Sequence, residues 1–376
     1  MKIIFGLLIL NIIVFIHELG HFIFAKIFGV KVLSFSIGMG PILFHKTIND
    51  TDYRISLLPL GGYCGMEGEE DFKNAIENNL SSFPKNKNSL YGIHPIKRAV
   101  IAFAGPFFNL ILAIFAYTII CMTPLDQVIL SNKIIIPDSS VESVARNAGL
   151  KTGDKIIQID NKKIESFDQI YEYVSLRPKT KMLIYVERDS QTLTFEVTTS
   201  LDKTQGTGLL GVMGDINSKT IIKTKTYPFF IAIIKGTEKM FEMISKTFQR
   251  FKLLFTGVDL TNVVSGPARI TSILGDTVTE GFNYGFTLGL CATLELVALI
   301  SISLGIMNLL PIPILDGGII LFALIHLIFK KEISPKTQYN IQKIGLIILI
   351  ILFIIGTTGD IRYFFSKWSE TKKKSY

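Results

Sequence analysis

The chain has 376 residues, of which 48% are hydrophobic and only 19% carry a charge. Its mean hydropathy of +0.42 excludes an ordinary soluble domain and predicts a polytopic α-helical membrane protein in contact with the lipid bilayer. The net charge of +8 does not indicate a nucleic-acid partner, because lysines that flank membrane spans give the same excess.

The first predicted element is a membrane span at about residues 3–28, and a second follows at about residues 99–122. Together they make up a predicted first region, residues 1–124. The chain begins like a signal peptide, but no A-x-A-like cleavage site follows and the apolar run continues. We therefore expect an uncleaved first span.

The first span contains the pattern His-Glu-x-x-His at His17, Glu18 and His21. Residues four apart share one face of a helix, so the two histidines can hold one metal ion. Glu18 lies beside them and can act as a general base on metal-activated water. A purely structural interpretation, in which the three side chains form hydrogen bonds between helices, stays open at this point.

The loop between the first two spans contains two apolar stretches, residues 34–44 and 53–66, which are punctuated by glycine. They are too broken for a helix, and their β-type residues predict two hairpins that enter the membrane against protein. The polar stretch at residues 67–89 predicts an exposed and mobile linker. The second span then carries the sequence FAGPFFN, which ends at Asn109.

Residues 127–216 change character and predict one soluble α/β module inserted between spans. Its sequence GLKTGDKIIQIDNKKI resembles a bacterial PDZ domain, present as a single copy, which implies a C-terminal peptide as its partner. An amphipathic segment at residues 226–258 follows. It either lies flat at the membrane surface or packs on the protein.

Residues 280–376 contain the third and fourth predicted spans, at about 286–310 and 344–359, with a basic tail. The loop between them carries four lysines and one glutamate, which favours the cytoplasmic side. The long loop after the first span is then cytoplasmic, and the inserted module is extracytoplasmic. Two other polar residues lie in apolar runs. Glu295 marks the outer end of its span or pairs in a buried position, and His326 packs, lies at the membrane interface or contributes to a site.

The third span ends in NLLPIPILDGG, in which Asp316 is an acid in an apolar stretch. A catalytic zinc site needs three protein ligands and one open position, and the histidine pair supplies two. If the first span begins outside, Asp316 and the histidines lie at a similar depth in the membrane. Asp316 is therefore the candidate third ligand, although a helix cap at the broken span is the alternative.

These motifs, in this order, resemble the site-2 protease family of intramembrane zinc metalloproteases (M50), and in particular its bacterial members that act in regulated intramembrane proteolysis. The resemblance covers nearly the whole chain. It implies Zn2+ held by His17, His21 and Asp316, with Glu18 as the catalytic base. It further implies substrate-binding residues, or in one case a packing residue, at four positions: Asn308, Asn109, Gly61 and Gly62.

The resemblance implies an endopeptidase of the bacterial inner membrane that cuts single-span membrane proteins, for example anti-sigma factors or remnant signal peptides. An extended substrate would add as a strand to the glycine-rich β-elements. Two departures stand out, because well-known members carry tandem PDZ domains and a polar residue where this chain has Ile319. A catalytically silent PDZ-containing membrane scaffold is the alternative, and a metal transporter ranks last.

Overall fold

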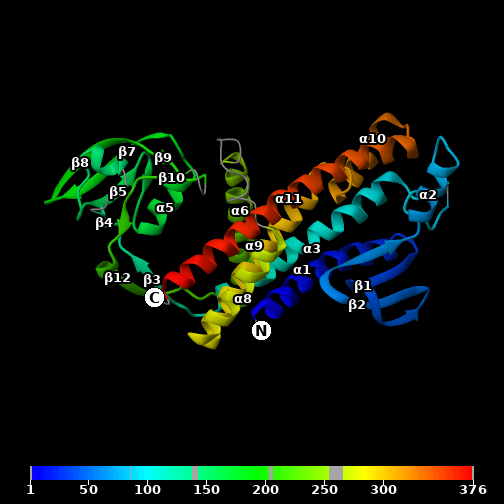
Figure 1. Ribbon diagram of the computed structural model, residues 1–376, viewed down its shortest axis with the longest axis horizontal. Helices are drawn as coiled ribbons and strands as arrows, with labels where there is room; N and C mark the ends of the chain where they lie inside the picture. The colour runs from blue at the N-terminus through cyan, green and yellow to red at the C-terminus, as the bar shows by residue number, and fades with distance from the viewer. Residues whose placement is uncertain (1, 85, 138–142, 203–205, 254–265, 375–376) are drawn as a thin grey trace. The chain divides into compact units, whose positions relative to one another are not determined.

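The computed structural model describes residues 2–84, 86–137, 143–202, 206–253 and 266–374 (Figure 1). The chain forms two compact units. One unit comprises Met1–Thr123, Tyr227–Ile244 and Gly266–Tyr376, and the other comprises Pro124–Thr226 and Ser245–Ser265.

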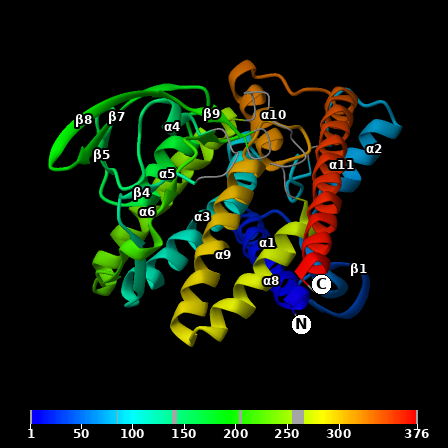
Figure 2. The ribbon, with the colours of Figure 1, turned by 60° about the vertical axis from the view of Figure 1, so that its left-hand side comes forward.

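Four helices among the described residues are long and apolar enough to cross a membrane, in agreement with the four predicted spans. They are α1 (Lys2–Ile27), α3 (Pro95–Met122), α9 (Phe286–Asn308) and the Pro335–Phe365 part of α11 (Pro335–Lys374). In the first unit α1 packs against α3, and α3 packs against α9 (Figure 2). Glycines allow these close approaches: a Cβ at Gly20 would lie only 2.3 Å from the carbonyl oxygen of Ala104.

Two further helices complete this unit, α8 (Pro267–Asn283) and the short apolar α10 (Asp316–Phe329). Neither was predicted as a separate helix. The α8 helix packs against α1 and α9, and α10 packs against α3. Asp360 of α11 accepts hydrogen bonds from the first backbone N–H groups of α8, at 2.8 Å from Gly266 N and 3.0 Å from Ala268 N. This contact satisfies groups that a helix N-terminus otherwise leaves unpaired.

The two glycine-punctuated stretches form one sheet and not two separate hairpins, which corrects the prediction. The strands β1 (Val32–Ile48) and β2 (Thr51–Met66) pair with each other along their length and lie beside α1 (Figure 1). The turn between them carries Asn49 and Asp50 at φ of 48° and 62°, the backbone that a type I′ hairpin turn requires. Both strands bend at glycines, so Ser36 has Tyr63 as partner on one side and Arg54 on the other.

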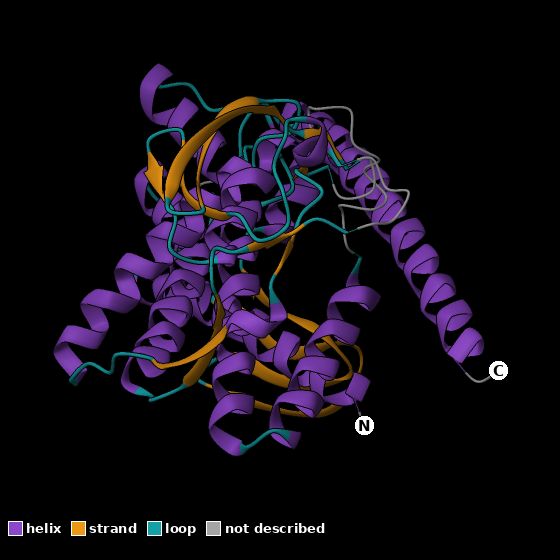
Figure 3. Ribbon diagram, turned by 90° about the vertical axis from the view of Figure 1, so that its left-hand side faces the viewer, coloured by secondary structure: helices purple, strands orange, loops and turns teal. Residues whose placement is uncertain are grey.

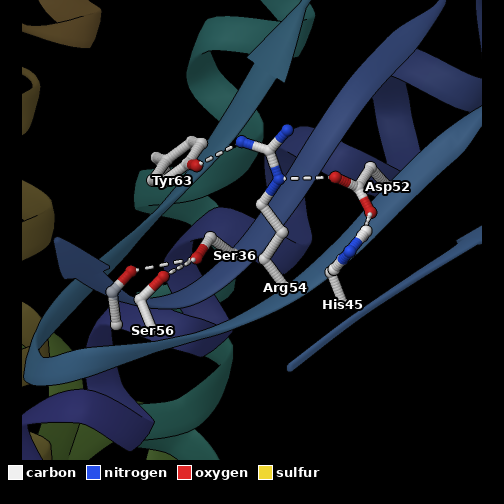
Figure 4. A network of polar contacts seen from close by, with 7 residues as sticks. Ser36, His45, Asp52, Arg54, Ser56 and Tyr63 are labelled. Atoms are coloured by element: carbon white, nitrogen blue, oxygen red, sulfur yellow. Dashed lines mark hydrogen bonds and ion pairs between the residues drawn. The ribbon is translucent and has the colours of Figure 1, made fainter. Parts of the chain in front are cut away.

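Polar contacts hold these bent strands together (Figure 4). Arg54 lies between two acceptors, with its Nε donating to Asp52 at 2.7 Å and its Nη1 donating to the Tyr63 hydroxyl at 2.9 Å. The hydroxyls of Ser36 and Ser56 are 3.1 Å apart. The side chain of Asp52 also contacts His45 at 3.1 Å, so its carboxylate has two partners. Polar residues of both strands therefore stabilise the sheet that lies beside α1.

The polar stretch at residues 67–89 contains a helix, α2 (Glu69–Glu77), where the sequence predicted an exposed linker. The reason lies in a stack of aromatic rings. Phe83 stacks on Tyr91 with ring centroids 4.1 Å apart, and Phe72 of the helix stacks on Phe83 at 5.5 Å. Phe83 is 3% exposed. The stacking of three aromatic rings around the buried Phe83 orders a segment whose composition is otherwise polar.

The second unit is built mainly from short strands, drawn in orange in Figure 3. A four-stranded sheet has the order β6 (Lys162–Lys163), β5 (Lys155–Ile159), β7 (Lys181–Arg188), β8 (Gln191–Thr198). Apolar side chains of this sheet and of α5 (Phe167–Ser175) contribute to the core of the unit. The predicted strand pair around residues 188–191 is confirmed by the pairing of Arg188 with Gln191. The elements are β3 (Asp126–Leu130), β4 (Ile134–Ile135), α4 (Val144–Asn147), β5 (Lys155–Ile159), β6 (Lys162–Lys163), α5 (Phe167–Ser175), β7 (Lys181–Arg188), β8 (Gln191–Thr198), β9 (Ser200–Leu201), β10 (Gly208–Leu209), β11 (Met213–Gly214), the 3-10 helix η1 (Ile216–Ser218) and β12 (Lys219–Lys223).

The amphipathic segment forms a helix, α6 (Phe229–Leu253), as its spacing predicted. Residues 254–258 of the predicted segment lie outside the described residues. Large apolar side chains on this helix are exposed, among them Phe241 at 62% and Phe248 at 52%. An exposed apolar face on a charged helix is compatible with either predicted placement, at a membrane surface or against protein.

Candidate metal centre

Two helices bring the candidate ligands together. His17 and His21 lie one turn apart on α1, and their side chains are 7% and 8% exposed. Asp316 is the first residue of α10, directly after the non-helical segment of residues 309–315 that follows α9. The two glycines that follow, Gly317 and Gly318, allow the backbone of residues 309–313 to pack closely against the start of α10. A Cβ at Gly317 would lie 2.2 Å from the carbonyl oxygen of Leu310.

The three side chains enclose a space that fits a zinc ion. The Nε2 atoms of His17 and His21 are 3.2 Å apart. Asp316 Oδ2 lies 3.2 Å from His17 Nε2, and Asp316 Oδ1 lies 3.4 Å from His21 Nε2. Ligands of a tetrahedral zinc site at about 2.0–2.1 Å from the metal are about 3.3–3.4 Å from one another. The observed separations are close to this length, and each histidine faces a different oxygen of the Asp316 carboxylate.

Hydrogen bonds behind the histidines fix which nitrogen faces the site. The Nδ1 atom of His21 lies 2.8 Å from the carbonyl oxygen of Ile101 and donates to it, so the lone pair is on Nε2. His17 Nδ1 lies 3.2 Å from the side-chain amide of Asn109. The Oδ1 atom of Asn109 is buried and has no partner within the described ranges, and we assign the amide so that this oxygen accepts from His17 Nδ1.

This assignment has an electrostatic consequence. Both Nε2 lone pairs then face each other and the Asp316 carboxylate, and the buried Oδ2 of Asp316 has His17 Nε2 as a neighbour but no hydrogen-bond donor among the described residues. Three electron-rich groups at these distances repel one another unless a cation lies between them. The donor set of two imidazoles and one carboxylate is one that catalytic zinc sites use. The residues therefore fit zinc by geometry and by charge.

Gly105 of α3 packs directly on the two imidazole rings, a role that sequence reasoning missed. A Cβ at this position would lie 2.3 Å from His21 Nε2 and 2.9 Å from His17 Cε1. No larger residue fits while the rings keep their positions. The sequence held a signal, since small residues in the middle of a span often mark close helix contacts. The carbonyl of Ile101 gave no signal, because a backbone partner depends only on the fold.

The centre opens into a cavity of about 420 Å³. Its lining includes His17, Glu18, His21 and Asp316, with Asn308 and Ile319 also present. Glu18 is half-buried there. The β-sheet lies against it, because a Cβ at Gly62 would be 3.8 Å from Glu18 Cγ and the backbone N–H of Cys64 faces the carboxylate. A carboxylate, a metal-binding set and a cavity thus meet in the first unit.

The predicted substrate-binding residues fall into three places. Asn308 lines the cavity, with its Nδ2 atom 3.4 Å from His17 Nε2. Asn109 is fully buried behind His17 and does not line the cavity. Gly61 and Gly62 lie against α1: a Cβ at Gly61, whose φ is +122°, would be 3.7 Å from a methyl carbon of Val14.

The other polar residues considered from sequence lie elsewhere. His326 faces Glu332 at 3.8 Å and is not part of the ligand set. Glu295 lies nine residues after the start of α9 and is exposed. Within the described residues, His17, His21 and Asp316 form the one group of three metal-binding side chains close enough to share an ion.

Comparisons with known proteins agree with this arrangement. The model of peptidase family M50 matches residues 5–352. A protein of Treponema pallidum named as a zinc metalloprotease is 32% identical over 97% of this chain and 99% of its own length. A protein of Campylobacter jejuni with the same description is 35% identical over 94% of this chain and 91% of its own length.

The family match covers far more than half of the chain, and its relatives align along almost their whole length. Four helices in the described part of the chain are long and apolar enough to cross a membrane. The chain therefore belongs to peptidase family M50, as its sequence motifs indicated, and is a membrane zinc metalloprotease that uses Zn2+.

Proposed function

We propose that this protein cuts peptide bonds inside the membrane, with Zn2+ held by His17, His21 and Asp316. The observation that carries the proposal is the tetrahedral spacing of these three side chains, at 3.2–3.4 Å, beside Glu18 in one cavity. Three helices of membrane-spanning length, α1, α3 and α9, contribute to the lining of this cavity. When bound, Zn2+ supplies Lewis acidity that makes water a nucleophile near neutral pH.

The side chains of the cavity divide the remaining work. Glu18 takes the proton of the attacking water and passes it to the leaving amine. Asn308, on the cavity wall beside His17, donates its amide to an oxygen of the substrate. Ile101 and Asn109 hold the two imidazoles in the ring orientation and tautomer that the site requires. Neither Ile101 nor Asn109 is proposed to contact the substrate.

We further propose that the substrate is a single-span membrane segment that binds in an extended form. The end of β2 supports this, because residues 62–66 pair with β1 on one side and, within the described residues, with no strand on the other. Tyr63 and Cys64 from this edge also line the cavity. A helix must unwind before its peptide bond can reach the metal, and pairing with a strand edge replaces the lost backbone hydrogen bonds.

The location follows from the same proposal. We place the protein in the bacterial inner membrane, with the loop between α10 and α11 in the cytoplasm. Basic residues in that loop support this orientation. The second unit, whose sequence resembles a PDZ domain, then lies outside and is proposed to bind C-terminal peptides. Anti-sigma factors and remnant signal peptides are the substrate classes that the family resemblance favours.

Cleavage of a single-span reporter, co-expressed with the intact chain or with Glu18→Gln, tests the function. The substitution keeps the shape of the side chain and all three ligands but removes the base. We expect a truncated reporter only with the intact chain, and at least about a hundredfold less product with the variant. Equal products from both chains, with zinc still bound to the variant, would favour the scaffold over the enzyme.

A further inference from the structure

Arg98 is a buried cation in the wall of the cavity, and the chemistry described above does not use it. Within the described lining it is the only lysine or arginine, and it is 2% exposed. It lies three residues before Ile101, whose carbonyl accepts from His21, so the two positions are about 4.5 Å apart along α3. Arg98 therefore lies about one helical turn before the residue whose carbonyl orients His21.

Few acceptors surround this guanidinium. Its Nη2 atom lies 3.3 Å from the carbonyl oxygen of Tyr91 and 3.5 Å from Glu332 Oε1, both at the long end of hydrogen bonding. The Nε atom is buried and has no acceptor among the described residues. A guanidinium carries five N–H donors, and buried polar groups normally find partners. Arg98 lines the cavity, and its Nε donor has no acceptor within the part of the chain that the structure describes.

A peptide in this cavity would bring the missing acceptors. Every residue of an extended peptide presents a main-chain carbonyl, and hydrolysis creates a carboxylate at the new C-terminus. Arginine binds both kinds of oxygen, and it matches a carboxylate with two parallel hydrogen bonds. No other cationic side chain of the described lining competes for that group, apart from the histidines that face the metal site.

We propose that Arg98 binds main-chain oxygens of the peptide on one side of the cleaved bond. In the substrate the oxygen is a carbonyl, and in the product it is the new carboxylate. Arg98 is then a substrate-positioning residue of the peptidase, which rests on the proposal that this cavity holds the reaction. The contact with Glu332 keeps the guanidinium against the wall until a peptide arrives.

Three variants separate this role from a structural one. Arg98→Gln removes the charge and the fork of donors, whereas Arg98→Lys keeps the charge alone. Glu332→Gln removes the ion pair and leaves Arg98 in place, so it is the matched control. If Arg98 only anchors the loop of Glu332, Arg98→Gln and Glu332→Gln have the same effect. If Arg98 binds the peptide, they differ.

The experiment measures peptide binding and cleavage by the full-length protein in detergent. The probes are two synthetic peptides with the sequence of the N-terminal cleavage product of the reporter, one ending in a carboxylate and one in a carboxamide. Binding is measured in the Glu18→Gln background, so the readout does not require activity. Zinc content of each variant shows that the metal centre is intact.

We expect Arg98→Gln to weaken binding of the carboxylate peptide about tenfold, the size of one charge-assisted hydrogen bond. A parallel loss for the carboxamide peptide identifies the carbonyl as a target as well, and an unchanged carboxamide identifies the carboxylate alone. In the active protein the reporter KM rises about tenfold while kcat changes less. Arg98→Lys recovers part of the affinity, and Glu332→Gln keeps all of it.

The proposal is overturned if Arg98→Gln binds both peptides as tightly as its parent does. It is equally overturned if Glu332→Gln reproduces every effect of Arg98→Gln. Failure of the proposed function has a different signature, in which Glu18→Gln cuts the reporter as well as the intact chain does. The binding arm still reports on Arg98 in that case.

Discussion

Gly105 shows how one residue without a side chain controls the metal centre. The Cα of Gly105 faces the two imidazoles so closely that an added methyl group would lie 2.3 Å from the ligand nitrogen of His21. That ring is held from behind by Ile101, so it has little freedom to move aside. The positions of the two histidine ligands thus depend on a helix contact as well as on their own helix.

Gly105→Ala is expected to lower zinc affinity by about 10–100-fold and activity in proportion, because the methyl group displaces both rings. Metal analysis of the purified variant after dialysis against a zinc buffer checks this. Ile111→Ala, on an exposed position of the same helix, is the control and should retain zinc. Full zinc occupancy in Gly105→Ala would show that the rings are free to move.

Elements of the first unit are tied by buried polar contacts as well as by apolar packing. Asp360 in α11 is 4% exposed and receives three backbone N–H groups from the start of α8, which also packs on α1. Through α8 the last helix of the chain supports the helix that carries the histidines. An uncapped α8 would leave buried donors without partners.

Asp360→Ala should therefore lower the free energy of unfolding by about 1–3 kcal/mol. The measurement is the midpoint of thermal unfolding in detergent, followed by the intrinsic fluorescence of the protein. Thr357→Ala is a suitable control, since this hydroxyl contacts only the backbone of its own helix at Phe353. A variant at Asp360 as stable as this control would show that α8 does not depend on the cap.

The sequence predicted those parts of the fold that depend on local pattern. Long apolar runs predicted the four spans, and the equal depth of two motifs predicted that Asp316 meets His17 and His21. Contacts between distant residues were not predictable. The pairing of β1 with β2 depends on how two bent strands meet, and α2 depends on the stacking of Phe83 on Tyr91. The same holds for Arg98, whose two hydrogen-bond partners, Tyr91 and Glu332, come from separate segments.

At the scale of the whole molecule, the account requires a fixed orientation in the membrane. The test uses two variants with a single cysteine each, Lys163→Cys in the second unit and Lys331→Cys in the loop after α10. Both positions are exposed. The background has its three native cysteines replaced by serine and must first be shown to cleave the reporter.

A maleimide that does not cross the inner membrane should label Lys163→Cys in cells whose outer membrane is permeabilised and whose inner membrane is intact. It should label Lys331→Cys only after the inner membrane is opened. The physical reason is the excess of lysine in the short loop, which favours the cytoplasmic side. The reverse pattern of labelling would invert the proposed topology, and with it the side from which substrates approach.

The most direct test of the account is the zinc content of three purified chains. The intact protein and Glu18→Gln should each hold about one zinc per chain, because Glu18 is a base and not a ligand. Asp316→Ala should lose most of its zinc, since it removes one of three ligands and leaves two facing histidines. Full zinc in Asp316→Ala, or its loss in Glu18→Gln alone, would contradict the roles assigned to these residues.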